Sequence, residues 1–155
     1  MNPCPCGYLG DPEKSCICNA GTIERYRSKL SGPLLDRIDI FLNVPRIKVQ
    51  DFEKKEKSEQ SAEIRSRVER ARKRQEVRFA GTLRWYNSEM TNKEIEVYCV
   101  LTPEADEFLK KAVERLSLST RVYFRILRLA RTIADIEDSD DILLPHVAEA
   151  LGYRQ

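Results

Sequence analysis

The sequence predicts a mainly α-helical fold, and three observations support this prediction. Apolar residues recur at helical spacing through most of residues 61–155. Helix-start signals precede several of these segments. Charged residues make up 34% of the 155-residue chain, which favours a helical, well-solvated surface. We therefore expect a helical domain over residues 61–155, a polar linker over residues 51–60, and a smaller part over residues 1–50 with one strand and one short helix.

The first fifty residues contain few patterned segments. Residues 1–21 are rich in Cys, Gly and Pro, which predicts a loop. A short helical pattern begins at Thr22 and ends at Gly32-Pro33. Residues 38–44 alternate between apolar and polar, which predicts a strand that Pro45 ends. Because one strand cannot form a sheet, its partners lie either in poorly patterned sequence or outside this chain.

The helices of residues 61–155 are predicted from caps and apolar stripes. Thr91 and Glu94 form a capping box, and Pro103 stands at a first helical position. The acidic turn EDSDD (137–141) is expected to end the helix before it. The expected helices are 61–79, a short one from Thr91, 102–116, 119–136 and 145–151.

The segment STRVYFRILRLARTIAD (119–135) places several arginines on one helical stripe. At about 100° per residue, Arg121, Arg125 and Arg128 lie together opposite an apolar face. Arginine suits phosphate because its planar fork donates two parallel hydrogen bonds. Asp135 is the only acid close to this stripe, so the arginines carry positive charge that an additional anion can neutralise. The alternative is a solvated face with ion pairs one turn apart, and the pattern does not decide between the two.

The long helix before it is also basic. Residues 63–79 contain seven basic and three acidic residues, and Arg67, Arg70 and Arg74 share a stripe with Arg78. Such a stripe can face nucleic acid, or it can be a solvated surface. The net charge of the chain is only +2, so any basic patch must be local.

Four of the five cysteines lie within CPCGYLGDPEKSCICN (4–19), as two Cys-x-Cys pairs separated by a short loop. Four thiolates can bind zinc tetrahedrally. The alternatives are unligated thiols or a redox pair. The proposed zinc ligands are Cys4, Cys6, Cys16 and Cys18.

The metal interpretation depends on the compartment. We see no signal peptide and no apolar run of the roughly 18 residues that cross a membrane. We therefore expect a cytoplasmic protein without a membrane partner, in which clustered thiols bind metal before they form disulfides. Cys99 is expected to be a buried small hydrophobe. His146, the only histidine, is expected to be a surface or capping residue.

The segment SGPLLDRIDI (31–40) places Arg37 directly before the expected strand. One interpretation is structural, with Arg37 paired to Asp36 and Asp39. The other is an arginine finger that stabilises the transferring phosphate of a nucleotide held by a neighbouring subunit.

Four segments together resemble the C-terminal part of the magnesium-chelatase-like AAA+ ATPases, and in particular the ComM/YifB subfamily associated with competence and DNA recombination. These segments span nearly the whole chain. They are MNPCPCGYLGD, RYRSKLSGPLLDRIDI, LSTRVYFRILRLARTIAD and HVAEALGYR.

The resemblance implies a role for several residues. Residues 1–50 would be the C-terminal remnant of an α/β AAA+ core, with Asn2 as sensor 1 and Arg37 as the arginine finger. Residues 61–155 would be the helical lid, with Arg121 as sensor 2. Arg125 and Arg128 are further candidates for the same phosphate.

The resemblance also implies ATP and Mg²⁺ as ligands, DNA as a partner, and a homo-oligomeric ring that we expect to be a hexamer. None of the six glycines stands in a G-x-x-x-x-G-K-[ST] loop, and no Asp-Glu pair follows an apolar run. We therefore expect a fragment that does not hydrolyse ATP alone. Two alternatives remain, namely a zinc- and DNA-binding module and a subunit of a metal chelatase complex.

Overall fold

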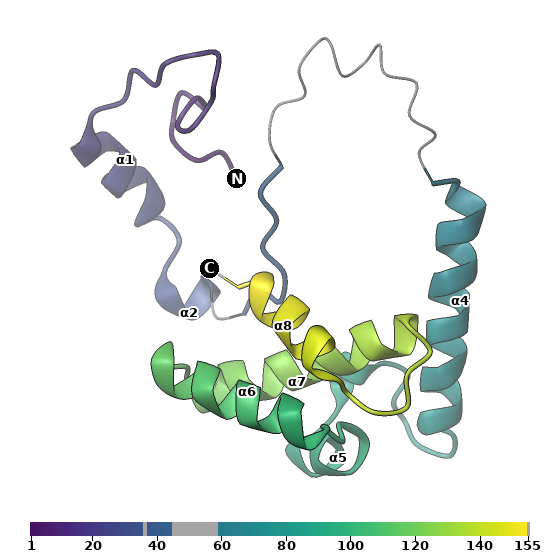
Figure 1. The fold of residues 1–155 in the computed structure, drawn as a ribbon. Coiled ribbons are helices and arrows are strands. Elements are labelled where there is room, and N and C mark those ends of the chain that lie inside the picture. The colour runs from purple at the N-terminus through teal and green to yellow at the C-terminus, as the bar shows by residue number, and fades with distance from the viewer. Residues whose placement is uncertain (36, 45–58, 155) are drawn as a thin grey trace. The chain divides into compact units, whose positions relative to one another are not determined.

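A computed structural model describes residues 1–35, 37–44 and 59–154, and the predicted mainly helical fold is confirmed there (Figure 1). The chain divides into two compact units. The first unit comprises Met1–Ile38 and Leu42–Glu56, and the second comprises Asp39–Phe41 and Lys57–Gln155. Most of the predicted linker, and also Asp36 and Pro45, lie outside the described residues. The α-helices are α1 (Ala20–Arg27), α2 (Gly32–Leu35), α4 (Ser61–Arg78), α5 (Asn92–Tyr98), α6 (Pro103–Arg115), α7 (Thr120–Ile136) and α8 (Leu144–Gly152), and a 3₁₀ turn, η1, covers Asn87–Glu89.

The first unit contains two short helices where one was expected. The side chain of Asn19 caps α1 by accepting a hydrogen bond from the Thr22 N–H at 2.8 Å, so this helix begins before the predicted start. Gly32-Pro33 was expected only to end a helix, but it opens α2, because proline fits the first turn of a helix. Neither helix contains a buried residue.

The predicted strand over residues 38–44 is wrong for the described structure, because that segment carries no strand assignment. A strand needs a neighbouring backbone, and the Phe41 N–H instead donates to the Tyr153 carbonyl at 2.8 Å. The apolar side of the alternation is open to solvent, with Leu42 71% and Val44 85% exposed. The pattern is therefore that of a strand, but the described residues do not supply a sheet for it.

The helix starts of the second unit follow the predicted caps. The Thr91 side chain accepts from the Glu94 N–H, and the Glu94 carboxylate accepts from the Thr91 N–H at 2.7 Å. Ser119 caps α7. The acidic turn ends α7 as expected: Asp138 adopts a positive φ of 58°, and the Ser139 N–H returns to the Ala134 carbonyl at 2.9 Å.

The core of the second unit surrounds α7, which packs against α4, α5, η1 and α8 (Figure 1). Some apolar residues at helical spacing, on which the prediction of these helices rests, do not reach this core. Leu116 is 58% exposed because it lies beyond the last turn of α6, and Ile64 and Val68 are about half exposed on the first turns of α4. The largest buried apolar side chains of the core are Phe79, Met90, Ile95, Leu109, Ile126, Leu127 and Ile142.

A buried carboxylate joins α4, η1 and α7. Asp135 has no exposed surface, and Arg78 binds both of its oxygens, at 2.6 and 2.7 Å. The Asn87 side-chain amide donates to the same carboxylate at 2.8 Å, and Arg131 donates at 3.2 Å. A buried charge is tolerated only when it is paired and hydrogen-bonded in this way.

We expect Asp135→Asn to lower the free energy of unfolding by about 3–5 kcal/mol, because it leaves buried guanidinium groups without a counter-charge. Urea denaturation followed by circular dichroism measures this. Glu107→Gln is the matched control: Glu107 pairs with Lys111 on an exposed helix face, so its loss should cost less than about 1 kcal/mol. Equal effects of the two substitutions would contradict the assigned role of Asp135.

Candidate metal centre and arginine sites

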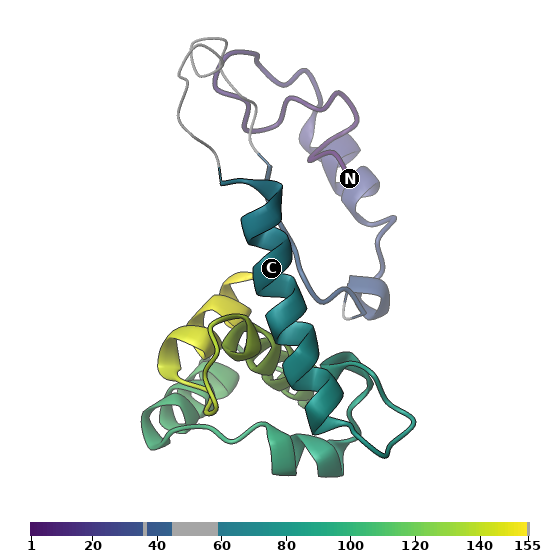
Figure 2. The same ribbon diagram turned by 90° about the vertical axis from the view of Figure 1, so that its right-hand side faces the viewer.

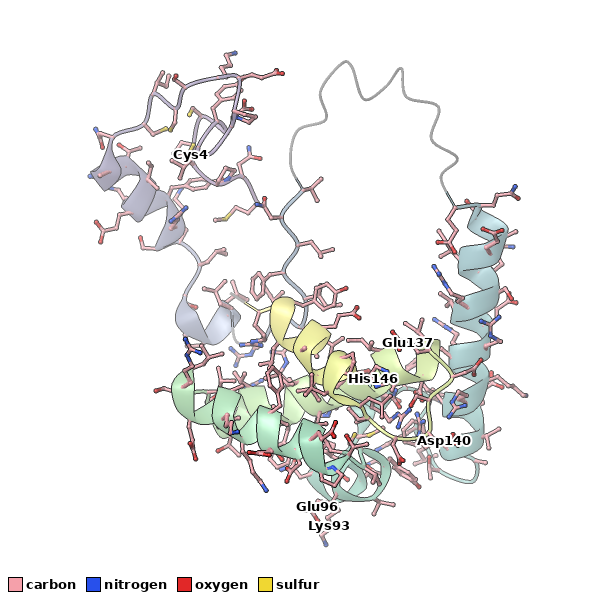
Figure 3. All side chains as sticks on the ribbon, in the orientation of Figure 1. Cys4, Lys93, Glu96, Glu137, Asp140 and His146 are labelled. Carbon is pink, nitrogen blue, oxygen red and sulfur yellow. The ribbon has the colours of Figure 1, made fainter. Side chains whose placement is uncertain are left out.

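The four N-terminal cysteines converge in a tight loop. Cys4 Sγ lies 3.4 Å from Cys6 Sγ and 3.6 Å from Cys16 Sγ, and all four sulfur atoms lie within 4.8 Å of one another. Gly7 and Gly10 turn the loop at positive φ, a conformation that side chains with a Cβ rarely adopt. Figure 3 shows sulfur atoms gathered around Cys4.

This spacing fits a metal ion rather than a disulfide. A bonded pair of sulfurs lies about 2.05 Å apart, whereas thiolates around one tetrahedral zinc lie about 3.8 Å apart for bonds of about 2.3 Å. All four cysteines are free thiols here. The cluster is therefore able to hold a metal ion such as zinc.

The pKa values of the clustered thiols shift in opposite directions. Backbone hydrogen bonds from Tyr8 and Ile17 lower the pKa of the Cys6 thiol to about 6. At Cys16, a backbone hydrogen bond from Cys18 is outweighed by burial and by hydrogen bonds with the neighbouring thiols, which raise the pKa to about 12, and the pKa of Cys18 is also raised. Cys4 is the only buried residue among the described residues of the first unit. Small units that lack an apolar core are commonly held together by a metal, so the cluster occupies the position where this unit needs a stabilising group.

Two predicted nucleotide-site residues lie in the first unit. Asn2 is exposed, and its side chain lies beside Gly7 of the cysteine loop. Arg37 is exposed, and its Nη1 donates to the Pro33 carbonyl at 2.8 Å, which supports the guanidinium at the end of α2. The predicted structural partner Asp39 instead binds Arg125, at 2.6 Å from Oδ1 to Nε.

The arginine stripe of α7 is divided along its length. Arg125 is bound by Asp39, and Arg128 donates to the Met90 carbonyl at 2.7 Å. Arg131 is 1% exposed and binds Asp135, and its burial lowers the pKa of the guanidinium. Arg121, in the first turn of α7, is exposed and makes no hydrogen bond or ion pair with the described residues. Of the predicted stripe, Arg121 is thus the member that the protein itself leaves available.

Each of the three α4 arginines predicted to bind nucleic acid faces an acidic side chain. Arg67 lies 2.8 Å from Glu59, and Arg70 lies 3.4 Å from Asp138. Arg74 binds Asp140, which Figure 3 labels beside α4, and lies 3.6 Å from Asp138. The pairs of Arg70 and Arg74 were not predicted because the EDSDD turn was interpreted only as the end of a helix, and Glu59, the partner of Arg67, falls in the expected linker.

Cys99 and His146, which lie outside these motifs, also have defined positions. Cys99 is buried as expected, and its burial raises the pKa of the thiol to about 12. His146 caps α8 as expected, because its Nδ1 accepts from the Leu143 N–H at 3.0 Å, but it is 1% exposed rather than on the surface. Its Nε2 lies 2.9 Å from Glu137 (Figure 3).

The magnesium-chelatase-like resemblance implies a role for Asn2, Arg37 and Arg121, and all three side chains are exposed. Comparison with known proteins confirms that resemblance. Residues 58–154 match the family "Magnesium chelatase, subunit ChlI C-terminal", and residues 1–52 match "Magnesium chelatase, subunit ChlI". The chain belongs to the magnesium chelatase ChlI family.

Its relatives are longer proteins. The chain is 41% identical over 156 residues to "Competence protein ComM" of Haemophilus influenzae, an alignment that covers 99% of this chain and 29% of that protein. It is 38% identical to "Uncharacterized protein YifB" of Salmonella typhimurium and of Escherichia coli, with the same coverage. The chain therefore spans about three-tenths of the length of the curated relatives that it matches.

None of the helices in the described residues combines the length and the apolar content that crossing a membrane requires.

We expect the purified chain to contain about one zinc ion, measured by elemental analysis, and to lose it when Cys16→Ser removes one ligand. Cys99→Ala is the matched control, because Cys99 lies outside the cluster and should leave the metal content unchanged. A chain that remains free of metal after refolding with zinc would contradict the assignment.

Proposed function

We propose that this chain supplies nucleotide-sensing residues, an arginine finger and a zinc-held loop to a ring-forming AAA+ ATPase that acts on DNA. The single observation that carries the proposal is the available guanidinium of Arg121, on a helix whose other stripe arginines are bound by the protein. The family and the ComM relative supply the context.

The position of Arg121 favours an anion. The first turn of a helix carries a partial positive charge, so a basic residue there is unfavourable unless a negative group lies nearby. The first turn of α7 contains no acidic residue. A nucleotide phosphate bound there would receive both the guanidinium donors and the helix dipole, which is the role that the family assigns to sensor 2.

Arg37 is proposed as the arginine finger. Its guanidinium is exposed, and its Nη1 donates to the Pro33 carbonyl at 2.8 Å, which supports the guanidinium at the end of α2. An arginine finger supplied by a neighbouring subunit stabilises charge on the transferring γ-phosphoryl group. ATP and Mg²⁺ would be held by other parts of the whole protein, in a ring that we propose to be hexameric.

The segment 38–44 is proposed to complete a sheet in the whole protein. Its alternating apolar residues are exposed and its backbone lacks a ladder, which is the state of a strand whose neighbour is supplied from elsewhere. Pairing would bury Leu42 and Val44 and would fix Arg37 directly before the strand.

The cysteine loop is proposed to hold a structural zinc ion that positions Asn2 as sensor 1. Asn2 lies two residues before the first cysteine, and its side chain contacts the turn at Gly7. A metal that fixes this loop also fixes the position of Asn2. Zinc would then serve the nucleotide site without touching the nucleotide.

DNA is proposed as the substrate because a relative that is 41% identical to this chain carries the name "Competence protein ComM". The alternative, a self-contained zinc- and DNA-binding module, is favoured only by the cysteine cluster, because Arg67, Arg70 and Arg74 are all paired with acidic groups. A role as a subunit of a metal chelatase complex rests on the family name alone.

We expect Arg37→Ala to lower the ATP hydrolysis rate by about 10³-fold, and Arg121→Ala to lower it by at least about tenfold through loss of a charge-assisted hydrogen bond. The assay uses a full-length protein in which this chain replaces the matching 156 residues of the Haemophilus influenzae relative. Lys111→Gln, on the exposed face of α6, is the control that should leave the rate unchanged.

Two results would count against the proposal. The first is a correctly folded unsubstituted chimera that neither binds nor hydrolyses ATP. The second is an unchanged hydrolysis rate in both arginine variants. Saturable DNA binding by the isolated chain that is lost with Cys16→Ser, without any ATP dependence in the chimera, would favour the binding module instead.

A further inference from the structure

The turn between α4 and η1 presents large apolar side chains to solvent. Leu83 is 96% exposed and Trp85 is 66% exposed, although both lie in an ordered part of the second unit. Figure 2 shows the segment after α4 extending away from the helices. A tryptophan with this exposure gains nothing from the core, so its position calls for another explanation.

The turn is held rigidly by hydrogen bonds. The Glu89 carboxylate accepts from the backbone N–H groups of Trp85, at 2.7 Å, and of Tyr86, at 3.2 Å. At the other end, the Thr82 hydroxyl donates to the Phe79 carbonyl and accepts from the Arg84 N–H. The indole is therefore displayed from a fixed backbone rather than from a loose loop.

A cation with unused donors contacts the next residue in the sequence, Tyr86. The guanidinium of Arg72 lies over the Tyr86 ring, 5.3 Å from its centroid, and makes no hydrogen bond or ion pair with the described residues. The acidic residues near it are largely engaged: Glu76 pairs with Lys73, and Glu89 holds the turn, while Glu69 lies on the same face of α4. The N–H donors of the Arg72 guanidinium are therefore available to an external acceptor.

We propose that Trp85, with Arg72 on Tyr86, forms a stacking platform for a base of single-stranded nucleic acid. The indole would stack on the base, and the guanidinium would bind the adjoining phosphate, the combination by which single strands are bound without sequence readout. The other α4 cations closest to Arg72 in sequence are paired with acidic groups, namely Arg70, Lys73 and Arg74. Arg72 is therefore the cation here whose donors favour an anionic partner over an apolar protein surface. The choice of nucleic acid rests on the proposed function, but the site is separate from the nucleotide-sensing residues.

The test uses the isolated chain, because Trp85 is its only tryptophan. With excitation selective for tryptophan, titration with a short oligothymidylate should quench the fluorescence in a saturable way, since a stacked base contacts the only tryptophan. In a parallel assay with a labelled oligothymidylate, Trp85→Leu should weaken binding about tenfold. Arg72→Gln should also weaken it, whereas Lys111→Gln, on α6, should not.

Two outcomes would overturn the platform. One is the absence of saturable quenching, together with equal oligonucleotide affinity of the Trp85→Leu variant and the unsubstituted chain. The other is a fluorescence change that follows protein concentration instead of oligonucleotide, which would identify a second copy of the chain as the occupant. Neither outcome depends on ATP, so loss of the platform and failure of the ATPase proposal are distinguishable.

Discussion

The helical unit depends on one buried carboxylate. Asp135 has no contact with solvent, and it holds Arg78 of α4, Asn87 of η1 and Arg131 of α7 at once. Removing a carboxylate from water is costly, and this cost is recovered only while all of its partners stay in place. The carboxylate therefore fixes how α4 lies against α7, because apolar contacts between these helices are few: Ala71 and Gln75 are the buried residues of α4.

The arginines of α4 and α7 differ in whether they take part in the network around Asp135. Arg131 and Arg78 are bound to Asp135, and Arg74 extends the same network to the acidic turn after α7. What remains on α7 is Arg121, and what remains on α4 includes Arg72. Arg121 and Arg72 are thus candidate binding groups whose hydrogen-bond donors the described residues do not take up. In the first unit a cluster of four thiols takes the place that an apolar core has in the second.

Much of the helical unit could be predicted from sequence because its signals are local. The Thr91–Glu94 box, the Ser119 cap and the stripe of α7 each lie within one or two helical turns. The pairs of Arg78 with Asp135 and of Arg74 with Asp140 join residues 57 and 66 positions apart, and no periodicity encodes such separations. The strand over 38–44 failed for a related reason, since alternation specifies a pairing face but not the backbone that pairs with it. The four cysteines were found because their spacing is local, although the spacing alone left open whether their sulfur atoms meet.

The α7 arginines are divided into a buried structural end, at Arg131, and an available end, at Arg121. Urea denaturation of Arg131→Ala and Arg121→Ala in the isolated chain tests this division by comparing their free energies of unfolding. We expect a loss of about 3–5 kcal/mol for Arg131→Ala, because Asp135 loses a buried partner, and no significant loss for Arg121→Ala. A marked destabilisation by Arg121→Ala, or a neutral Arg131→Ala, would contradict it.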